Sequence, residues 1–231
     1  MVLEAGNSMT TSAHALGALS ELCQIYWRPL YAFLRRQGYR PEDAQDLTQG
    51  FFAHLIESRT YTHADREKGR FRSFLLGALK HFIADARDRR YALKRGGGIA
   101  PGNLDENAIA EAEAQLARTA KWQAHEVYDR EWAASLLREA LHRLTQECAV
   151  AGKTELVGYL TPYLAAPEES AIPYEEMARQ LHRPIATLRS DVARLRARYR
   201  AILREEVRGT VTEATEVDEE LRYLCRALAA T

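Results

Sequence analysis

Apolar residues recur every three or four positions along most of the chain, which is the spacing of a helix that buries one face. Strand-like alternation is nearly absent, so we expect an all-α protein. A first helix is predicted over residues 18–37, and a second begins at Pro41, which suits a first helical turn, and runs to about Ile56. A longer helical stretch begins at Phe71 and ends before the glycine run at residues 96–98.

The second half of the chain repeats this pattern. Apolar residues from Trp132 to Leu164 predict two more helices. Two shorter predicted helices follow, over residues 174–181 and 185–204, and only the turn at residues 182–184 separates them. These lengths and this tight connection are typical of a helix-turn-helix.

Two small helical domains are the expected architecture, because a Gly- and Pro-containing stretch that becomes rich in Ala, Glu and Gln separates the two helical blocks. An apolar stripe from Val217 to Leu228 predicts a short amphipathic helix outside both domains. We therefore expect a first domain over residues 18–97 and a second domain over residues 131–207, joined by a partly helical linker over residues 98–130. Residues 1–17 would form an N-terminal tail, and residues 208–231 a C-terminal extension.

The distribution of charge is more informative than the net charge, which is zero, with 32 basic and 32 acidic residues. Residues 179–204 hold eight arginines against one aspartate, whereas residues 205–231 hold seven acids against three arginines. Segregated charge concerns partners rather than fold. The arginine-rich stretch coincides with the predicted helix-turn-helix, which favours a nucleic-acid partner.

Several protein classes are disfavoured. No apolar run reaches the roughly 18 to 20 residues that span a bilayer, and the N-terminus has no secretion signal, so we expect a cytoplasmic protein that does not bind membranes. Cys23, Cys148 and Cys225 are far apart in sequence, and we expect buried thiols with neither a disulfide nor a metal. The sequence has no phosphate loop or nucleophile motif, so we expect neither an enzyme nor a cofactor.

A cationic stripe is predicted on the helix over residues 185–204. Apolar side chains from Ile185 to Leu203 fill one arc of its helical wheel, and Ser190 and six arginines fill the other. A solvated arginine-rich face is the simple interpretation. The short helix and tight turn before it favour a DNA-reading helix instead, because arginine both grips phosphate and reads guanine edges.

A polar face is predicted on the helix that begins at Pro41. Asp43, Asp46 and Gln49 repeat every three positions, opposite an apolar face of Leu47, Phe51 and Leu55. Pairing with the helix dipole explains Asp43 alone, so a protein-binding face is the alternative to a merely solvated one.

The third helical stretch carries cations away from its apolar side. Ser73, Lys80, His81 and Arg87 lie there, and further basic residues such as Arg90 extend the run. Cations mixed with aromatic rings are the ingredients of single-strand binding, where each stacked base contributes roughly 1 to 3 kcal/mol.

Four segments, in this order along the chain, resemble the motifs of an extracytoplasmic-function sigma factor of bacterial RNA polymerase. Residues 41–49, PEDAQDLTQ, resemble the surface of region two that binds the polymerase clamp, and residues 71–75, FRSFL, resemble the entry into the promoter-melting segment. Residues 174–178, YEEMA, and residues 183–190, RPIATLRS, resemble region four.

The resemblance implies a role for each surface and no catalytic residue. Core RNA polymerase would bind at Asp43, Asp46 and Gln49. The single-stranded minus-ten promoter element would contact Ser73, Lys80, His81, Arg87 and Arg90, and the duplex minus-thirty-five element would contact Arg183, Thr187, Arg189, Ser190 and Arg194. Farther along the helix, Arg198, Arg200 and Arg204 would hold DNA backbone or water. An anti-sigma factor or another regulator is a further partner that the resemblance allows.

Two questions stay open in the sequence. A helix-turn-helix repressor or activator that acts without replacing the sigma subunit would also explain residues 174–204, although it leaves the first domain unexplained. The acids before and within the C-terminal helix, from Glu213 to Glu220, would either restrain a basic DNA-binding face or accompany a helix that completes the core of the second domain.

Overall fold

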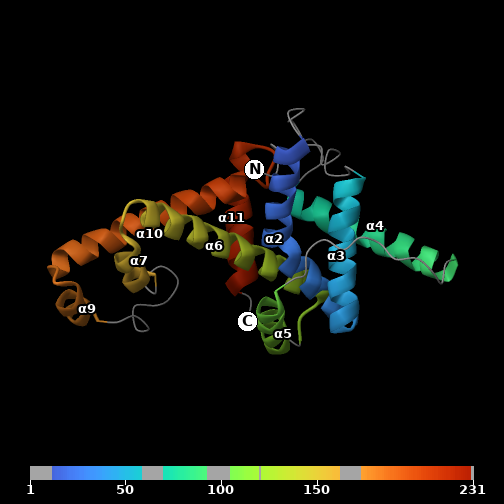
Figure 1. Ribbon diagram of the computed structural model, residues 1–231, viewed down its shortest axis with the longest axis horizontal. Helices are drawn as coiled ribbons and strands as arrows, with labels where there is room; N and C mark the ends of the chain where they lie inside the picture. Colours follow the sequence, from blue (N-terminus) through green and yellow to red (C-terminus); the bar gives the residue numbers. More distant parts are fainter. Residues whose placement is uncertain (1–11, 59–69, 93–104, 120, 162–172, 230–231) are drawn as a thin grey trace. The chain divides into compact units, whose positions relative to one another are not determined.

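The computed structural model describes residues 12–58, 70–92, 105–119, 121–161 and 173–229, with the backbone alone for residues 12–22, 87–92, 155 and 160. These residues form helices and turns without a strand, which confirms the all-α expectation. The helices are α2 (Ser12–Arg36), α3 (Pro41–Glu57), α4 (Phe71–Ala92), α5 (Glu106–Arg118), α6 (Ala124–Val150), α7 (Thr154–Leu160), α9 (Tyr174–Leu181), α10 (Ile185–Arg208) and α11 (Val217–Ala229), with the 3-10 turn η4 (Ala214–Glu216) before the last (Figure 1).

Contacts group the chain into two compact units. One comprises Met1–Ser135 together with Val207–Thr231, and the other comprises Leu136–Glu206. Both boundaries fall inside helices, since α6 and α10 each contribute to both units. The C-terminal segment therefore belongs to the same unit as the N-terminal half of the chain. None of the described helices is long and apolar enough to cross a membrane.

Helix α3 begins and ends close to where the sequence predicts. Pro41 occupies its first turn with two acids behind it, an arrangement that the helix dipole favours. Gly38, in the turn before it, has a φ of 92°, a left-handed conformation that glycine adopts without strain. Phe51 and Leu55 are buried as predicted, while Leu47 is only half-buried and Ala44 completes the buried face.

An aromatic cluster joins three helices of the first unit. The rings of Tyr26 in α2 and Trp132 in α6 are stacked, with centroids 4.2 Å apart, and Phe71 of α4 lies edge-on to Tyr26 at 6.1 Å. All three side chains are buried. Ring pairs of this kind stabilise a fold by about 0.5 to 1.5 kcal/mol beyond the burial of their area.

A buried ion network lies beside this cluster, because Arg72 follows Phe71 directly. The Arg72 guanidinium binds Asp129 of α6, and its Nε lies 3.2 Å from Oε1 of Glu220 in α11. The Tyr223 hydroxyl donates to Asp129 at 2.5 Å, and the Tyr223 ring lies 4.4 Å from the Arg72 guanidinium carbon. Burial opposes the charge on Arg72, but the two carboxylates outweigh it and raise the pKa of Arg72. We name these four residues the Arg72 network.

Helix α11 is amphipathic, as the sequence predicts, and it packs into the first unit. Val217 and Leu224 are buried, and the Phe71 amide donates at 3.0 Å to the carbonyl of Thr210, in the segment between α10 and η4. The alternative that this helix completes the core of the second domain is therefore wrong. The prediction of three buried thiols is also wrong, since Cys225 is exposed and Cys23 is only half-buried.

Helix α5 lies within the stretch expected to be a linker, and it is tied to α2. The Arg35 guanidinium donates to both oxygens of Glu113, at 2.6 and 2.9 Å, and the Tyr31 hydroxyl donates to Glu113 at 2.7 Å. The hydrogen bonds from Arg35 lower the pKa of Glu113. Arg36 also donates to the Thr119 carbonyl at 2.6 Å, which satisfies a carbonyl at the C-terminal end of α5.

The second unit has two connected apolar clusters. One joins Ala140 and Leu144 of α6 to Val157 of α7 and Ile202 of α10. The other joins Met177 of α9 to the first turns of α10 and is described with the helix-turn-helix below. Helix α7 ends at Leu160, and Leu164, at the end of the helix predicted there, lies outside the described residues, as does the glycine run at residues 96–98.

The Arg72 network predicts unequal costs for two neighbouring acids. Glu220→Gln removes a carboxylate that is 1% exposed from a buried guanidinium, and we expect a loss of roughly 3 kcal/mol in the free energy of unfolding. Glu219→Gln is the matched control, because Glu219 is 64% exposed and its pair with Arg70 should contribute about 1 kcal/mol or less. Urea titrations followed by circular dichroism measure both. A loss of about 1 kcal/mol or less for Glu220→Gln, as for an exposed pair, would show that the network does not stabilise the unit.

The contact between α5 and α2 predicts a pH dependence. The folded pKa of Glu113 lies below the ordinary value of 4.5, so its stabilisation is fully present above that value and is lost as the pH falls through the lower, folded pKa. Glu113→Gln should therefore lower the melting temperature at pH 7, and the difference from the parent should shrink below about pH 4. A difference that is the same at pH 7 and at about pH 3 would contradict this assignment.

Candidate nucleic-acid interface

The helix-turn-helix forms where the sequence predicts it, from α9, a short turn and the start of α10. The turn depends on His182, whose φ of 49° is left-handed, a conformation in which histidine is several-fold enriched among non-glycine residues. The Arg183 amide then donates to the Ala178 carbonyl at 3.2 Å and closes the end of α9. Met177 of α9 and Leu188 of α10 are both fully buried and fix the two helices against each other.

The outer face of the helix-turn-helix presents the residues predicted to contact the minus-thirty-five element. All five are exposed: Arg183, Thr187, Arg189, Ser190 and Arg194. The Arg189 guanidinium carbon lies 5.4 Å from the ring centre of Tyr174, so a residue of α9 supports it by a cation–π contact. We call these five exposed residues the arginine face.

Asp191 stands within the arginine face and binds two of its arginines. Its Oδ2 lies 3.2 Å from Nη1 of Arg183, and its Oδ1 lies 2.5 Å from Nη2 of Arg194. Arg183 comes from the turn and Arg194 from the third turn of α10. The carboxylate thus connects a residue that precedes α10, Arg183, with one inside the helix, Arg194.

The far half of α10 carries ion pairs to α6. Arg198, expected to hold DNA backbone or water, donates Nη2 and Nε to the two carboxylate oxygens of Glu147 in α6, at 2.6 and 2.7 Å. These hydrogen bonds lower the pKa of Glu147. Arg143 of α6 binds Glu205 at 2.8 Å and also Glu206. Ion pairs therefore occupy part of the predicted cationic stripe, and the turn and the first half of α10 carry the arginine face.

The predicted polymerase-binding residues lie on one side of α3. Asp46 is exposed, and Asp43 and Gln49 are half-buried. Spacings of three residues place them along one face, away from the buried Phe51 and Leu55. Within the described part of the chain neither carboxylate has an ion-pair partner, so this face offers two unneutralised negative charges to a partner.

The described minus-ten candidates are exposed on α4. Ser73 and Lys80 are seven residues apart and share a side of the helix, and His81 is exposed next to Lys80. The Lys80 ammonium also lies 5.7 Å from the ring centre of Phe33 in α2. The side chains of Arg87 and Arg90 lie outside the described residues. The candidates on α3 and α4 thus belong to the first unit and the arginine face to the second.

The sequence prediction missed the Arg72 network, although it contains a signal for it. Glu220 stands three residues after Val217 and four before Leu224, so it falls on the apolar stripe of α11 rather than on its polar side. Asp129 likewise precedes the buried Ala133 by four residues. A charged residue at an apolar position of a helix predicts a buried ion pair.

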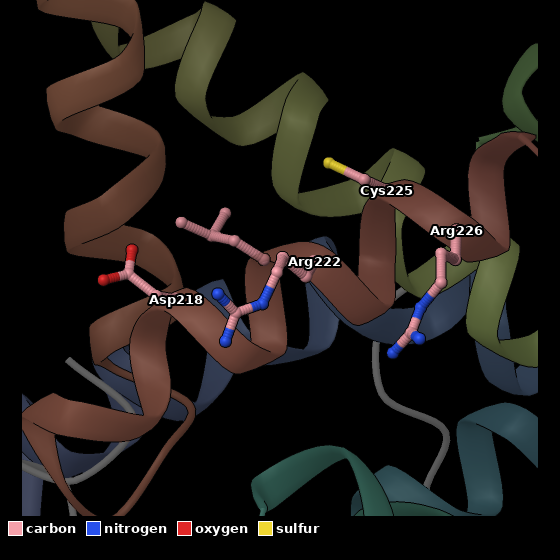
Figure 2. A pocket seen from close by; sticks show the side chains of 5 residues that line it. Asp218, Arg222, Cys225 and Arg226 are labelled. Carbon is pink, nitrogen blue, oxygen red and sulfur yellow. The ribbon is translucent and has the colours of Figure 1, made fainter.

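The outer side of α11 is hollowed. Figure 2 shows side chains projecting from this single helix, and the residues that line the hollow are Asp218, Leu221, Arg222, Cys225 and Arg226. Cys225 follows Arg222 by three residues and Arg226 follows Arg222 by four, and the exposed thiol lines the hollow together with these two arginines. No group of three or more His, Cys, Asp or Glu side chains could hold a metal ion in the described ranges.

Unequal contributions to DNA binding are expected from two arginines of α10. Arg189→Ala should weaken binding of the full chain to duplex DNA and reduce the salt slope by about 1, because this guanidinium is exposed on the arginine face. Arg198→Ala is the matched control: it also removes one positive charge, but Glu147 already holds that guanidinium. Binding titrations at several salt concentrations compare the two. A larger effect of Arg198→Ala would place the DNA contact elsewhere on α10.

Comparisons with protein-family models, curated proteins and solved structures gave no match to this chain. Three surfaces of the chain bear on its function: the arginine face, the polar face of α3 and the exposed side of α4.

Proposed function

We propose that this chain is a sigma factor, which binds core RNA polymerase and directs it to promoters. One observation carries the proposal: a helix-turn-helix with an exposed arginine face follows, on the same chain, a helical unit with exposed candidate residues on α4 and a polar face on α3 whose carboxylates have no ion-pair partner among the described residues. The order of these surfaces is the order of the sequence motifs that resemble a sigma factor. The proposal assigns a role to both units.

The arginine face would bind the duplex minus-thirty-five element. Arg189 and Ser190 lie in the first two turns of α10, the part of a recognition helix that reaches base edges in the major groove. An arginine that reads guanine O6 and N7 gives about 1 to 3 kcal/mol of discrimination. Phosphate contacts by the neighbouring arginines would fix the register of the helix without reading sequence.

The exposed side of α4 would hold the minus-ten element after its strands separate. Flipping a base out of the duplex costs a few kcal/mol, which stacking and hydrogen bonds to the protein must return. By the resemblance, His81 stands where the family holds a flipped base. Lys80 and Ser73 supply a charge and a hydroxyl on the same helix for the phosphate backbone.

The polar face of α3 would bind polymerase. Two carboxylates without ion-pair partners among the described residues complement a basic surface, and charge complementarity fixes the orientation of a complex and speeds its association. The other partners and properties follow as parts of the same proposal. They are promoter DNA, an anti-sigma factor or other regulator, a cytoplasmic location, and action without a catalytic residue.

A repressor or activator that binds duplex DNA by itself is the second candidate. The helix-turn-helix favours it as strongly as it favours a sigma factor. It gives no role to the acidic face of α3, which is the surface on which the two functions differ.

Charge reversal on α3 tests the proposal. Asp46→Arg places a cation on an exposed position of the polar face, and we expect at least a tenfold weaker affinity for core RNA polymerase, because one reversed contact costs more than the roughly 1.4 kcal/mol that a factor of ten represents. Affinity is measured by titrating labelled full chain with core enzyme.

Glu57→Arg is the matched control. Glu57 is exposed in the last turn of the same helix, two turns beyond Gln49, where the dipole favours a cation. Both variants must show the circular dichroism and melting temperature of the parent. Parental affinity of a folded Asp46→Arg would refute the α3 assignment, and a parent that does not bind core enzyme would refute the proposed function.

A further inference from the structure

Asp191 is placed to control two arginines at once. Its side chain is 13% exposed, whereas those of Arg183 and Arg194 are 47% and 71% exposed. The carboxylate therefore lies beneath the two guanidinium groups on the arginine face. Each of its oxygens faces a different arginine, Oδ2 towards Arg183 and Oδ1 towards Arg194.

This pairing contributes little to folding. Exposed ion pairs typically stabilise a protein by at most a small amount, because solvent screens them and the side chains lose freedom. Of the three side chains, only that of Asp191 is half-buried and therefore held in place. The main effect of the ion pairs is on the two arginines, which are long and flexible and adopt many rotamers unless a partner holds them.

Among the described residues, no other contact occupies the remaining donors of the two arginines. The contact uses one terminal nitrogen of Arg183, Nη1, and one of Arg194, Nη2. A guanidinium carries five N–H donors in a rigid fork, so each arginine keeps donors for a second partner. When Asp191 holds one side of a guanidinium group, the N–H donors on its other side point in a defined direction.

We propose, on the basis of the DNA-binding role given above, that Asp191 is a positioning residue that sets sequence specificity by holding Arg183 and Arg194 for guanine edges. Guanine presents two acceptors, O6 and N7, side by side in the major groove, which match two donors of one guanidinium. An arginine held in place reads this pattern. A free arginine can turn to any nearby phosphate, which is the same in every sequence.

The negative charge of Asp191 should affect the specificity and the affinity of DNA binding in opposite directions. A carboxylate among arginines repels phosphate, so it weakens binding to every DNA sequence. Removing the carboxylate should therefore strengthen binding to unrelated DNA while discrimination falls. A residue needed only for folding would weaken binding to all sequences together.

Two variants and one control test the proposal in the full chain reconstituted with core RNA polymerase. Asp191→Asn keeps the shape of the side chain, and Asp191→Ala removes its polar atoms. Glu175→Gln removes one exposed negative charge from α9 of the same helix-turn-helix without touching either arginine. Each holoenzyme is titrated with a duplex that the parent selects from a randomised minus-thirty-five pool and with a scrambled duplex of equal composition.

The expected result is a specificity ratio, selected over scrambled, that falls roughly tenfold in both Asp191 variants, while affinity for the scrambled duplex rises. Glu175→Gln should raise affinity for the scrambled duplex and keep the parental ratio. Selections repeated with Asp191→Ala should lose preference at guanine positions.

Two results would overturn the proposal. They are a parental ratio in both Asp191 variants, and a fall in Glu175→Gln equal to that in the Asp191 variants. A parent holoenzyme that selects no sequence would instead refute the proposed function, and the two failures are thus distinct.

Discussion

The buried guanidinium of Arg72 is the constraint on which the first unit depends. An uncompensated charge in a protein interior is costly, so the fold must bring carboxylates to it, and these come from α6 and α11. The network therefore requires the C-terminal helix to pack where α4 begins, although Arg72 and Glu220 are 148 residues apart in sequence. Aromatic stacking between Tyr26 and Trp132 fixes α2 against the same place.

This constraint has a consequence for the proposed function. Helix α4 carries the candidates for contact with single-stranded DNA. In its first turn Arg72 is buried in the ion network, and the next residue, Ser73, is exposed. The C-terminal acids Glu219 and Glu220 bind Arg70 and Arg72, so part of the acidic segment compensates these arginines. Although the net charge of the chain is zero, two of its surfaces carry opposite charges. They are the acidic face on α3 and the arginine face on the helix-turn-helix.

Local patterns allowed much of this fold to be predicted. The start of α3 at Pro41, the bounds of α9 and the apolar arc of α10 follow from residues within one or two turns. The partners of Arg72 and Arg198 do not, because they come from other helices and depend on tertiary packing. The same holds for Asp191, where the sequence shows only an acid among arginines and the structure shows which oxygen faces which arginine.

Transcription in a purified system would show whether the chain directs core RNA polymerase to promoters. Core RNA polymerase would be incubated with a library of promoter fragments, with and without the full chain, and the transcripts sequenced. If the chain is a sigma factor, we expect defined 5′ ends that require the chain, at promoters sharing a minus-ten and a minus-thirty-five element. Duplex DNA binding by the chain alone, together with transcripts unchanged by its addition, would rule out a sigma factor and favour a repressor or activator.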